Sequence, residues 1–203
     1  MFPDFFAAAP TLCLHDPLAD LLGAPVGGVF EYRYEDAVRL AGHSCPTVAS
    51  AFLMLRAGLG ALYGSELPVR GEIRVELAEA AEAGVAGVIA AVATLLTGAA
   101  GEGGFRGLGG RFSRRERLFF ARPTVAGTLR LTRLDTRQAV TVNADLSGIP
   151  VDPHMGPLLS LCLEGRANPA ERCLFQGLWQ ERVRQLLLEH ADDPQVIRVI
   201  LES

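Results

Sequence analysis

The sequence predicts an α+β fold, in which a mostly antiparallel sheet packs against helices. The chain has 203 residues, 49% of them apolar, which is enough for one full hydrophobic core. Helical and period-two apolar spacings occur in the order helices, strand, helix, hairpin, helices. No repeat, low-complexity linker or charge run marks a boundary, so we expect residues 1–203 to form a single domain.

The first third of the chain predicts three helices and a short extended piece. Residues 16–23 begin with an aspartate suited to an N-cap and a proline suited to the first helical position, and they end in glycine. Residues 29–34 have period-two apolar spacing, and a helical segment follows from 34 to 42. Residues 46–63 are apolar all round, which predicts a long buried helix.

The middle of the chain predicts a strand, a helix and a loop. Apolar and polar residues alternate over 71–80, as in a strand with one wet face. The segment from Ala83 to Gly101 is uncharged and rich in Ala and Gly, and we interpret it as a close-packed buried helix rather than a membrane span. The glycine-rich loop from Gly101 to Gly110 then leads into a further strand.

The last third predicts a hairpin and two helices. The hairpin connects through the letters DTRQ, and the residues expected to face each other across it are Leu129, Leu131 and Leu134 against Val140 and Val142. A C-terminal helical part of about 151–203 holds two helices, and its last residues form a strand or a short helix.

Charge and residue usage exclude several classes of function. The net charge of −4 predicts neither a nucleic-acid partner nor binding to an anionic membrane. The chain has no lysine, which rules out a Walker A phosphate loop, a pyridoxal Schiff base and a lysine general base. The N-terminal residues lack a basic region, so we expect a cytoplasmic protein with free thiols.

The stretch GHSCP at 42–46 is the main candidate site. His43 and Cys45 are both good ligands for zinc and other transition metals, and they stand just before the helix that opens at Pro46. The positive end of that helix favours metal binding or nucleophilicity at Cys45. The alternative is a capped turn with a buried thiol.

A metal site needs further ligands than these two. His15 is the best third candidate because Cys13 stands two residues before it, and His154 ranks next. Cys162 and Cys173 fall within apolar helical runs, which predicts that they belong to the core. No GxSxG turn or other serine-histidine-aspartate signal occurs.

The glycine-rich loop is followed by a cluster of arginines. Rossmann and P-loop glycines precede a helix, whereas these precede a strand, so neither phosphate loop is indicated. Two interpretations stay open, a solvated edge strand or a site for an anionic ligand held by Arg111, Arg114 and Arg115.

The letters AGHSCPTVASAFLMLRAGL and, further on, TLLTGAAGEGGFRGLGGRF resemble the FmdE family of formylmethanofuran dehydrogenase subunits, also called FmdE-like or FwdE-like proteins. The match covers about 35–120. Relative to the family's His-Gly-His-x-Cys-Pro-Gly motif, His43 and Cys45 match the second histidine and the cysteine, while Ala41 and Thr47 depart from it. Ala99 stands where the family commonly has a second cysteine.

The resemblance implies a fold related to the second domain of glyceraldehyde-phosphate dehydrogenases, a homodimer, and zinc or another transition metal near His43 and Cys45. The missing ligands would be replaced by His15, by Cys13 or by water. The first hypothesis is therefore a metal-binding protein, either an enzyme or a metal- or redox-handling accessory protein. The alternative is a non-catalytic dimeric binding module that recognises an anionic ligand through the Gly101 to Gly110 loop and the arginines after it.

Overall fold

The computed structural model describes residues 2–202. Its α-helices are α1 (Pro17–Leu22), α2 (Tyr34–Ala41), α3 (Pro46–Tyr63), α4 (Ala86–Thr97), α5 (Met155–Leu163) and α6 (Pro169–Leu188), with two 3₁₀ helices, η1 (Asp4–Ala8) and η2 (Val26–Gly28). Its strands are β1 (Leu12–His15), β2 (Val29–Tyr32), β3 (Ile73–Leu77), β4 (Leu118–Phe119), β5 (Leu129–Arg133), β6 (Ala139–Ala144) and β7 (Ile197–Glu202).

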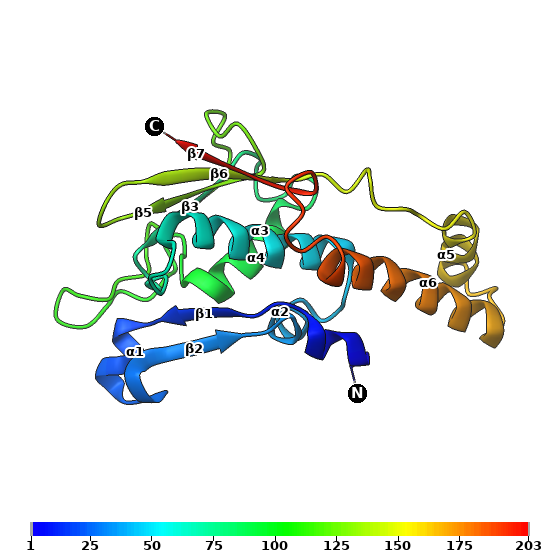
Figure 1. The fold of residues 1–203 in the computed structure, drawn as a ribbon, viewed down its shortest axis with the longest axis horizontal. Coiled ribbons are helices and arrows are strands. Elements are labelled where there is room, and N and C mark those ends of the chain that lie inside the picture. The colour runs from blue at the N-terminus through cyan, green and yellow to red at the C-terminus, as the bar shows by residue number, and fades with distance from the viewer. Residues whose placement is uncertain (1, 203) are drawn as a thin grey trace.

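The elements form three layers, which Figure 1 shows from the side. A five-stranded sheet lies above α3 and α4, and the two-stranded sheet of β1 and β2 lies below these helices. The helix pair α5 and α6 extends away from the layers, with only the last turns of α6 packed in the core. The predicted α+β fold, with a mostly antiparallel sheet against helices, is confirmed.

The large sheet has the strand order β4-β3-β5-β6-β7. All neighbours are antiparallel except β3 and β4, which are parallel. In the predicted hairpin, Leu129 lies opposite Val142 and Leu131 opposite Val140, as expected. The prediction for Leu134 was wrong, because β5 ends at Arg133 and the backbone N–H of Leu134 donates instead to the carbonyl oxygen of Glu72.

Helix α3 forms the centre of the core. It is the one helix within residues 2–202 that is long and apolar enough to cross a membrane, and 72% of it is buried inside the protein. Gly58 lets it approach the sheet closely, since a Cβ there would lie 2.7 Å from a methyl carbon of Leu131. Helix α4 is buried as predicted, but with 12 residues it is shorter than the segment from Ala83 to Gly101.

The predicted helix ends are confirmed at α1 and α2. The side chain of Asp16 accepts hydrogen bonds from the backbone N–H groups of Leu18 and Ala19, and Gly23 has a φ of +78°. Strand β1, in contrast, was not predicted. Cys162 is only partly buried and Cys173 is exposed, which corrects the expectation that both belong to the core. They lie on the helix pair that extends away from the layers.

Candidate functional site

The GHSCP turn joins α2 to α3. Helix α2 ends at Gly42, with a φ of +76°, and Cys45 is the N-cap of α3. The Sγ atom of Cys45 accepts the backbone N–H of Val48 at 3.4 Å, and the residue is only 8% exposed. The thiol therefore satisfies a free N–H group at the helix start, which is the capping role that the sequence left open.

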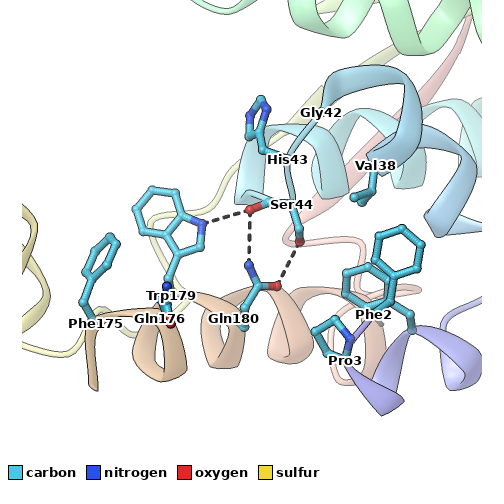
Figure 2. A pocket seen from close by; sticks show the side chains of 11 residues that line it. Phe2, Pro3, Val38, Gly42, His43, Ser44, Phe175, Gln176, Trp179 and Gln180 are labelled. Atoms are coloured by element: carbon cyan, nitrogen blue, oxygen red, sulfur yellow. Dashed lines mark hydrogen bonds between the residues drawn. The ribbon is translucent and has the colours of Figure 1, made fainter. Parts of the chain in front are cut away.

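Ser44, in the middle of the turn, is held by α6. The indole Nε1–H of Trp179 and the side-chain amide of Gln180 both donate to the carbonyl oxygen of Ser44, at 3.0 and 3.3 Å (Figure 2). The hydroxyl of Ser44 donates to Gln180 Oε1 at 3.0 Å and lies 2.9 Å from the hydroxyl of Tyr34. Because the carbonyl and the hydroxyl of Ser44 are both engaged, the turn is fastened to α6.

Tyr34, which contacts Ser44, is a buried phenol. Its side chain is fully buried, which raises the pKa of the phenol well above its ordinary value of 10.0, although the hydrogen bond to Ser44 opposes the shift. Since the Ser44 hydroxyl donates to Gln180, the Tyr34 hydroxyl is the donor to Ser44. The hydroxyl of Ser44 contacts Tyr34 and Gln180, neither of which is a general base, so this arrangement does not activate Ser44 as a nucleophile.

A pocket of about 410 Å³ lies beside this turn. Phe175 and Trp179 lie on one side of it, and Phe2, Pro3 and Val38 lie on the other (Figure 2). The lining residues within 2–202 are Phe2, Pro3, Phe6, Val38, Gly42, His43, Ser44, Phe175, Gln176, Trp179 and Gln180. Aromatic and aliphatic surface with a few polar groups is the usual lining of a small-molecule site.

His43 supplies a polar group at this pocket. The ring is exposed, and its Nδ1 lies 3.0 Å from the backbone carbonyl oxygen of Ala41. A carbonyl oxygen only accepts, so Nδ1 carries the proton of the neutral ring, and Nε2 has its lone pair available. This nitrogen can accept a hydrogen bond from a ligand, take a proton, or coordinate a metal.

The three predicted metal ligands do not come together. Cys45 caps the first turn of α3, whereas the backbone N–H of His15 donates to the carbonyl oxygen of Pro68, just beyond the other end of the helix. An 18-residue helix is about 27 Å long, so His15 is remote from the GHSCP turn. Within residues 2–202 no group of three or more His, Cys, Asp or Glu side chains is placed to hold a metal ion.

His15 and His154 have partners of their own. The Nε2 atom of His15 lies 3.7 Å from Asp20, and Nδ1 of His154 lies 2.9 Å from Asp152, at the exposed start of α5. The chain alone thus offers two ligands at the GHSCP turn, and these do not fit a closed zinc site of four side chains. Metal binding by His43 and Cys45 stays a prediction.

The three arginines predicted to hold an anion each contact a different partner within the protein. The guanidinium of Arg111 stacks on the ring of Phe112, and Nε of Arg115 donates to the carbonyl oxygen of Glu102 at 2.6 Å. The side chain of Arg114 is only 8% exposed and pairs with Asp16. Arg114 is thus part of the internal structure, and anion binding by this loop stays a prediction.

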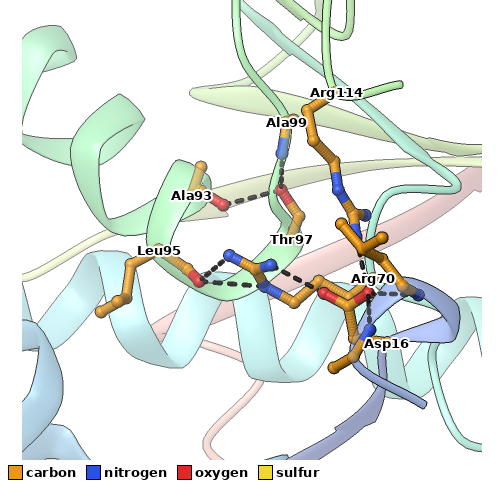
Figure 3. A network of polar contacts seen from close by, with 9 residues as sticks. Asp16, Arg70, Ala93, Leu95, Thr97, Ala99 and Arg114 are labelled. Carbon is orange, nitrogen blue, oxygen red and sulfur yellow. Dashed lines mark hydrogen bonds and ion pairs between the residues drawn. The ribbon is translucent and has the colours of Figure 1, made fainter. Parts of the chain in front are cut away.

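Asp16 lies between two arginines in a buried network that Figure 3 shows. Nη2 of Arg114 lies 2.6 Å from one carboxylate oxygen and Nη1 of Arg70 lies 2.9 Å from the other. Arg70 also donates to the carbonyl oxygen of Leu95, near the end of α4. Burial disfavours the charged carboxylate, but the hydrogen bond from Arg70 and the charge of Arg114 outweigh it, so the pKa of Asp16 is lowered.

Trp179, Gln180 and the Asp16 to Arg114 pair were missed by reasoning from the sequence. Trp179 follows Ser44 by 135 residues, and Arg114 follows Asp16 by 98. The one local signal was that Trp179 is the only tryptophan of the chain and stands in a largely polar helix. A large apolar side chain in such a helix commonly marks a contact.

Comparisons with known proteins find a likeness in structure alone. No protein-family model matches the chain, and no curated protein does. Among solved structures, a tungsten formylmethanofuran dehydrogenase FmdE-like protein from Syntrophus aciditrophicus is similar, with 17% sequence identity and a TM-score of 0.41. The match covers 85% of this chain and 73% of that one. A likeness at this level does not place the chain in that family.

Proposed function

We propose that the protein binds a small, largely apolar or aromatic molecule in the pocket beside the GHSCP turn. The observation that carries this proposal is the lining itself, in which four aromatic side chains surround about 410 Å³ and His43 offers a free Nε2. The ligand would stack against Phe175 and Trp179 and donate a hydrogen bond to His43. No reaction is assigned to the site.

The fixed turn supports this proposal. The bonds from Trp179 and Gln180 to Ser44 hold the turn and α6 together, so the side of the pocket formed by α6 is joined to the turn before a ligand arrives. A site that needs little ordering loses less free energy on binding. The amide of Gln176 also lines the pocket and adds a polar group with which a ligand can pair.

The only tryptophan of the chain makes the proposal testable by fluorescence. The dye 8-anilino-1-naphthalenesulfonate, bound in the pocket, should quench Trp179 by energy transfer in a saturable titration. Replacing Phe175 by Ala removes one stacking face, and we expect dye affinity to fall about tenfold. Phe105→Ala, which truncates an exposed phenylalanine in the glycine-rich loop, should leave it unchanged. Equal dye affinity in wild type and Phe175→Ala would overturn the proposal.

A second candidate function is metal binding at the same turn, as expected of an FmdE-like protein. Two features support it: His43 keeps Nε2 unengaged, and Cys45 follows two residues later. With these two side chains alone, zinc or another transition metal would be bound weakly and would need water or a ligand molecule to complete its coordination. When bound, such an ion would act as a Lewis acid.

A further inference from the structure

Within residues 2–202, no helix covers the outer face of the five-stranded sheet. Helices α3 and α4 pack on one face only (Figure 1). Along β3, Ile73, Val75 and Leu77 point into the core, so Arg74 points to the outer face. Thr132 lies directly opposite Arg74 in the neighbouring strand β5. An arginine and a threonine therefore stand side by side on this face.

A pocket of about 530 Å³ lies over this pair of strands, and we call it the sheet-face pocket. Its lining is Arg74, Arg130, Thr132, Arg133, Leu134 and Arg137. Four of these six residues are arginines, and none of the described lining residues is acidic. Arg133 lies opposite the core-facing Ile73 and donates to the carbonyl oxygen of Leu62, so its guanidinium is directed to the inner side of the sheet. Guanidinium groups at a cavity are the donors with which proteins bind phosphate and carboxylate groups.

Two of the four arginines already have carboxylate partners. Arg130 pairs with Glu76 at 3.0 Å and Glu202 at 2.8 Å. Arg133 pairs with Asp135 at 2.7 Å and with Glu66 at 3.1 Å, and it also stacks on the ring of Tyr63. These two arginines are neutralised by the protein itself.

Arg74 and Arg137 are different. Both are exposed, and neither forms an ion pair with any residue from 2 to 202. The guanidinium carbon of Arg74 lies 5.6 Å from the centroid of the Phe119 ring, which is a cation–π contact. Arg74 and Arg137 thus border the pocket without a directly paired carboxylate in the described chain, whereas Arg130 and Arg133 each face two. An anion bound between Arg74 and Arg137 would give both guanidinium groups a partner.

Thr132 is an independent indication of a ligand. The residue is 9% exposed, and its hydroxyl oxygen is buried without a hydrogen-bond partner within the described chain. A buried hydroxyl without a hydrogen-bond partner lowers the stability of the fold. In native proteins such a group commonly serves a function or contacts a bound water or ion. Since Thr132 lines the sheet-face pocket, an oxyanion drawn in by the arginines would supply the missing acceptor.

We propose that the sheet-face pocket binds the phosphate group of a small phosphorylated molecule. Arg74 and Arg137 pair with the phosphate oxygens, Arg130 flanks them, and the Thr132 hydroxyl donates to one oxygen. Phosphate suits the site better than a single carboxylate, because it carries up to two negative charges and accepts several hydrogen bonds. The volume of 530 Å³ leaves room for the rest of the molecule.

This site is independent of the pocket at the GHSCP turn and of the Gly101 to Gly110 loop. None of its residues lines the first pocket. Arg111, Arg114 and Arg115, which the sequence singled out for an anion, take no part in it. The two proposals can therefore fail separately.

The test is isothermal titration of the full chain with inorganic phosphate and with ribose 5-phosphate, at constant ionic strength set by chloride, with ribose as the uncharged control. We expect saturable binding of both phosphates and none of ribose. Tighter binding of ribose 5-phosphate identifies a phosphate ester as the ligand class, and equal affinities identify recognition of the phosphate alone. No saturable binding of either phosphate overturns the proposal.

Variants assign the binding to this pocket. Arg74→Gln and Arg137→Gln change exposed side chains that form no ion pair within residues 2–202, so folding should be preserved, and each should weaken phosphate binding at least tenfold. Arg172→Gln, an exposed arginine of α6 without an ion pair in the described chain, is the matched control and should bind as wild type does. Wild-type affinity in the Arg74→Gln/Arg137→Gln double variant overturns the proposal.

Thr132→Val provides a second readout. Valine has the shape of threonine but lacks the buried hydroxyl, so without phosphate the midpoint of thermal unfolding should stay the same or rise. With phosphate, the variant should gain less stability than wild type does. An unchanged phosphate effect in Thr132→Val excludes the hydroxyl as a ligand contact and contradicts the proposed geometry.

Discussion

Trp179, in the middle of α6, donates its indole N–H to the carbonyl oxygen of Ser44 at 3.0 Å, across 135 residues of sequence. Gln180, the next residue along the helix, donates to the same oxygen at 3.3 Å. The two bonds fasten a C-terminal helix to the turn that opens the central helix α3. They also join the side of the proposed ligand pocket formed by α6 to the turn.

The first prediction concerns this double contact. Trp179→Phe should lower the free energy of unfolding by about 1 kcal/mol, because Gln180 still donates to the Ser44 carbonyl. Combining it with Gln180→Leu leaves that carbonyl without either donor, and the double variant should lose about 1–3 kcal/mol more than the sum of the single losses. Urea unfolding followed by circular dichroism measures all three. Additive losses would show that the two bonds act independently.

The second prediction concerns the space that Arg114 occupies. Gly71 has a φ of +89°, and a Cβ on it would lie 1.4 Å from Nη1 of Arg114. Gly71→Ala should therefore displace the guanidinium from Asp16 and strain the backbone, which we expect to cost about 3 kcal/mol or more in unfolding free energy. Gly101→Ala is the matched control, since its Cβ would meet nothing within 4 Å. Similar thermal unfolding of the two variants would contradict the packing described.

The third prediction concerns pH. The folded protein holds the pKa of Asp16 below its ordinary value of 3.8, so this carboxylate stabilises the fold above pH 3.8. Its contribution is lost as the pH falls from 3.8 through the lower folded pKa. Asp16→Asn keeps a side chain able to cap α1 but leaves Arg114 buried without its charged partner, which at pH 7 should cost about 3–5 kcal/mol.

The quantity to measure is the difference in unfolding free energy between wild type and Asp16→Asn, because the other carboxylates titrate in both proteins and cancel. That difference in unfolding free energy should be largest near pH 7 and should shrink below pH 3.8. Asp192→Asn, which changes a carboxylate that is 80% exposed, should show almost no difference at any pH. A difference for Asp16→Asn that does not vary with pH would rule out the charge of Asp16 as its cause.

The fourth prediction concerns metal binding. With His43 and Cys45 as its two protein ligands, zinc should bind weakly, and a chelator should remove it without unfolding the protein. In equilibrium dialysis against zinc, His43→Ala and Cys45→Ser should each take up less zinc than wild type, and His15→Ala, remote from the turn, should take up as much. Elemental mass spectrometry measures the content. Equal zinc in all four proteins would contradict a site at the GHSCP turn.

The conformational preferences of single residues were sufficient to predict where helices begin and end. The N-cap of Asp16, the glycine after α2, the proline that opens α3 and the register of Leu129 with Val142 all followed from steric or hydrogen-bonding preferences that act over a few residues. Cys45 as a capping residue was one of two interpretations that the sequence left open.

The meeting of distant segments, in contrast, depended on how the whole chain packs. Packing placed β4 parallel to β3, separated His15 from His43 by the length of α3, and buried Arg114 against Asp16 instead of leaving it in an exposed arginine cluster. It also brought Trp179 to Ser44 and joined Arg74, Thr132 and Arg137 in one pocket. Apolar periodicity specifies which face of an element is buried, but the partner of that face depends on how all layers pack together.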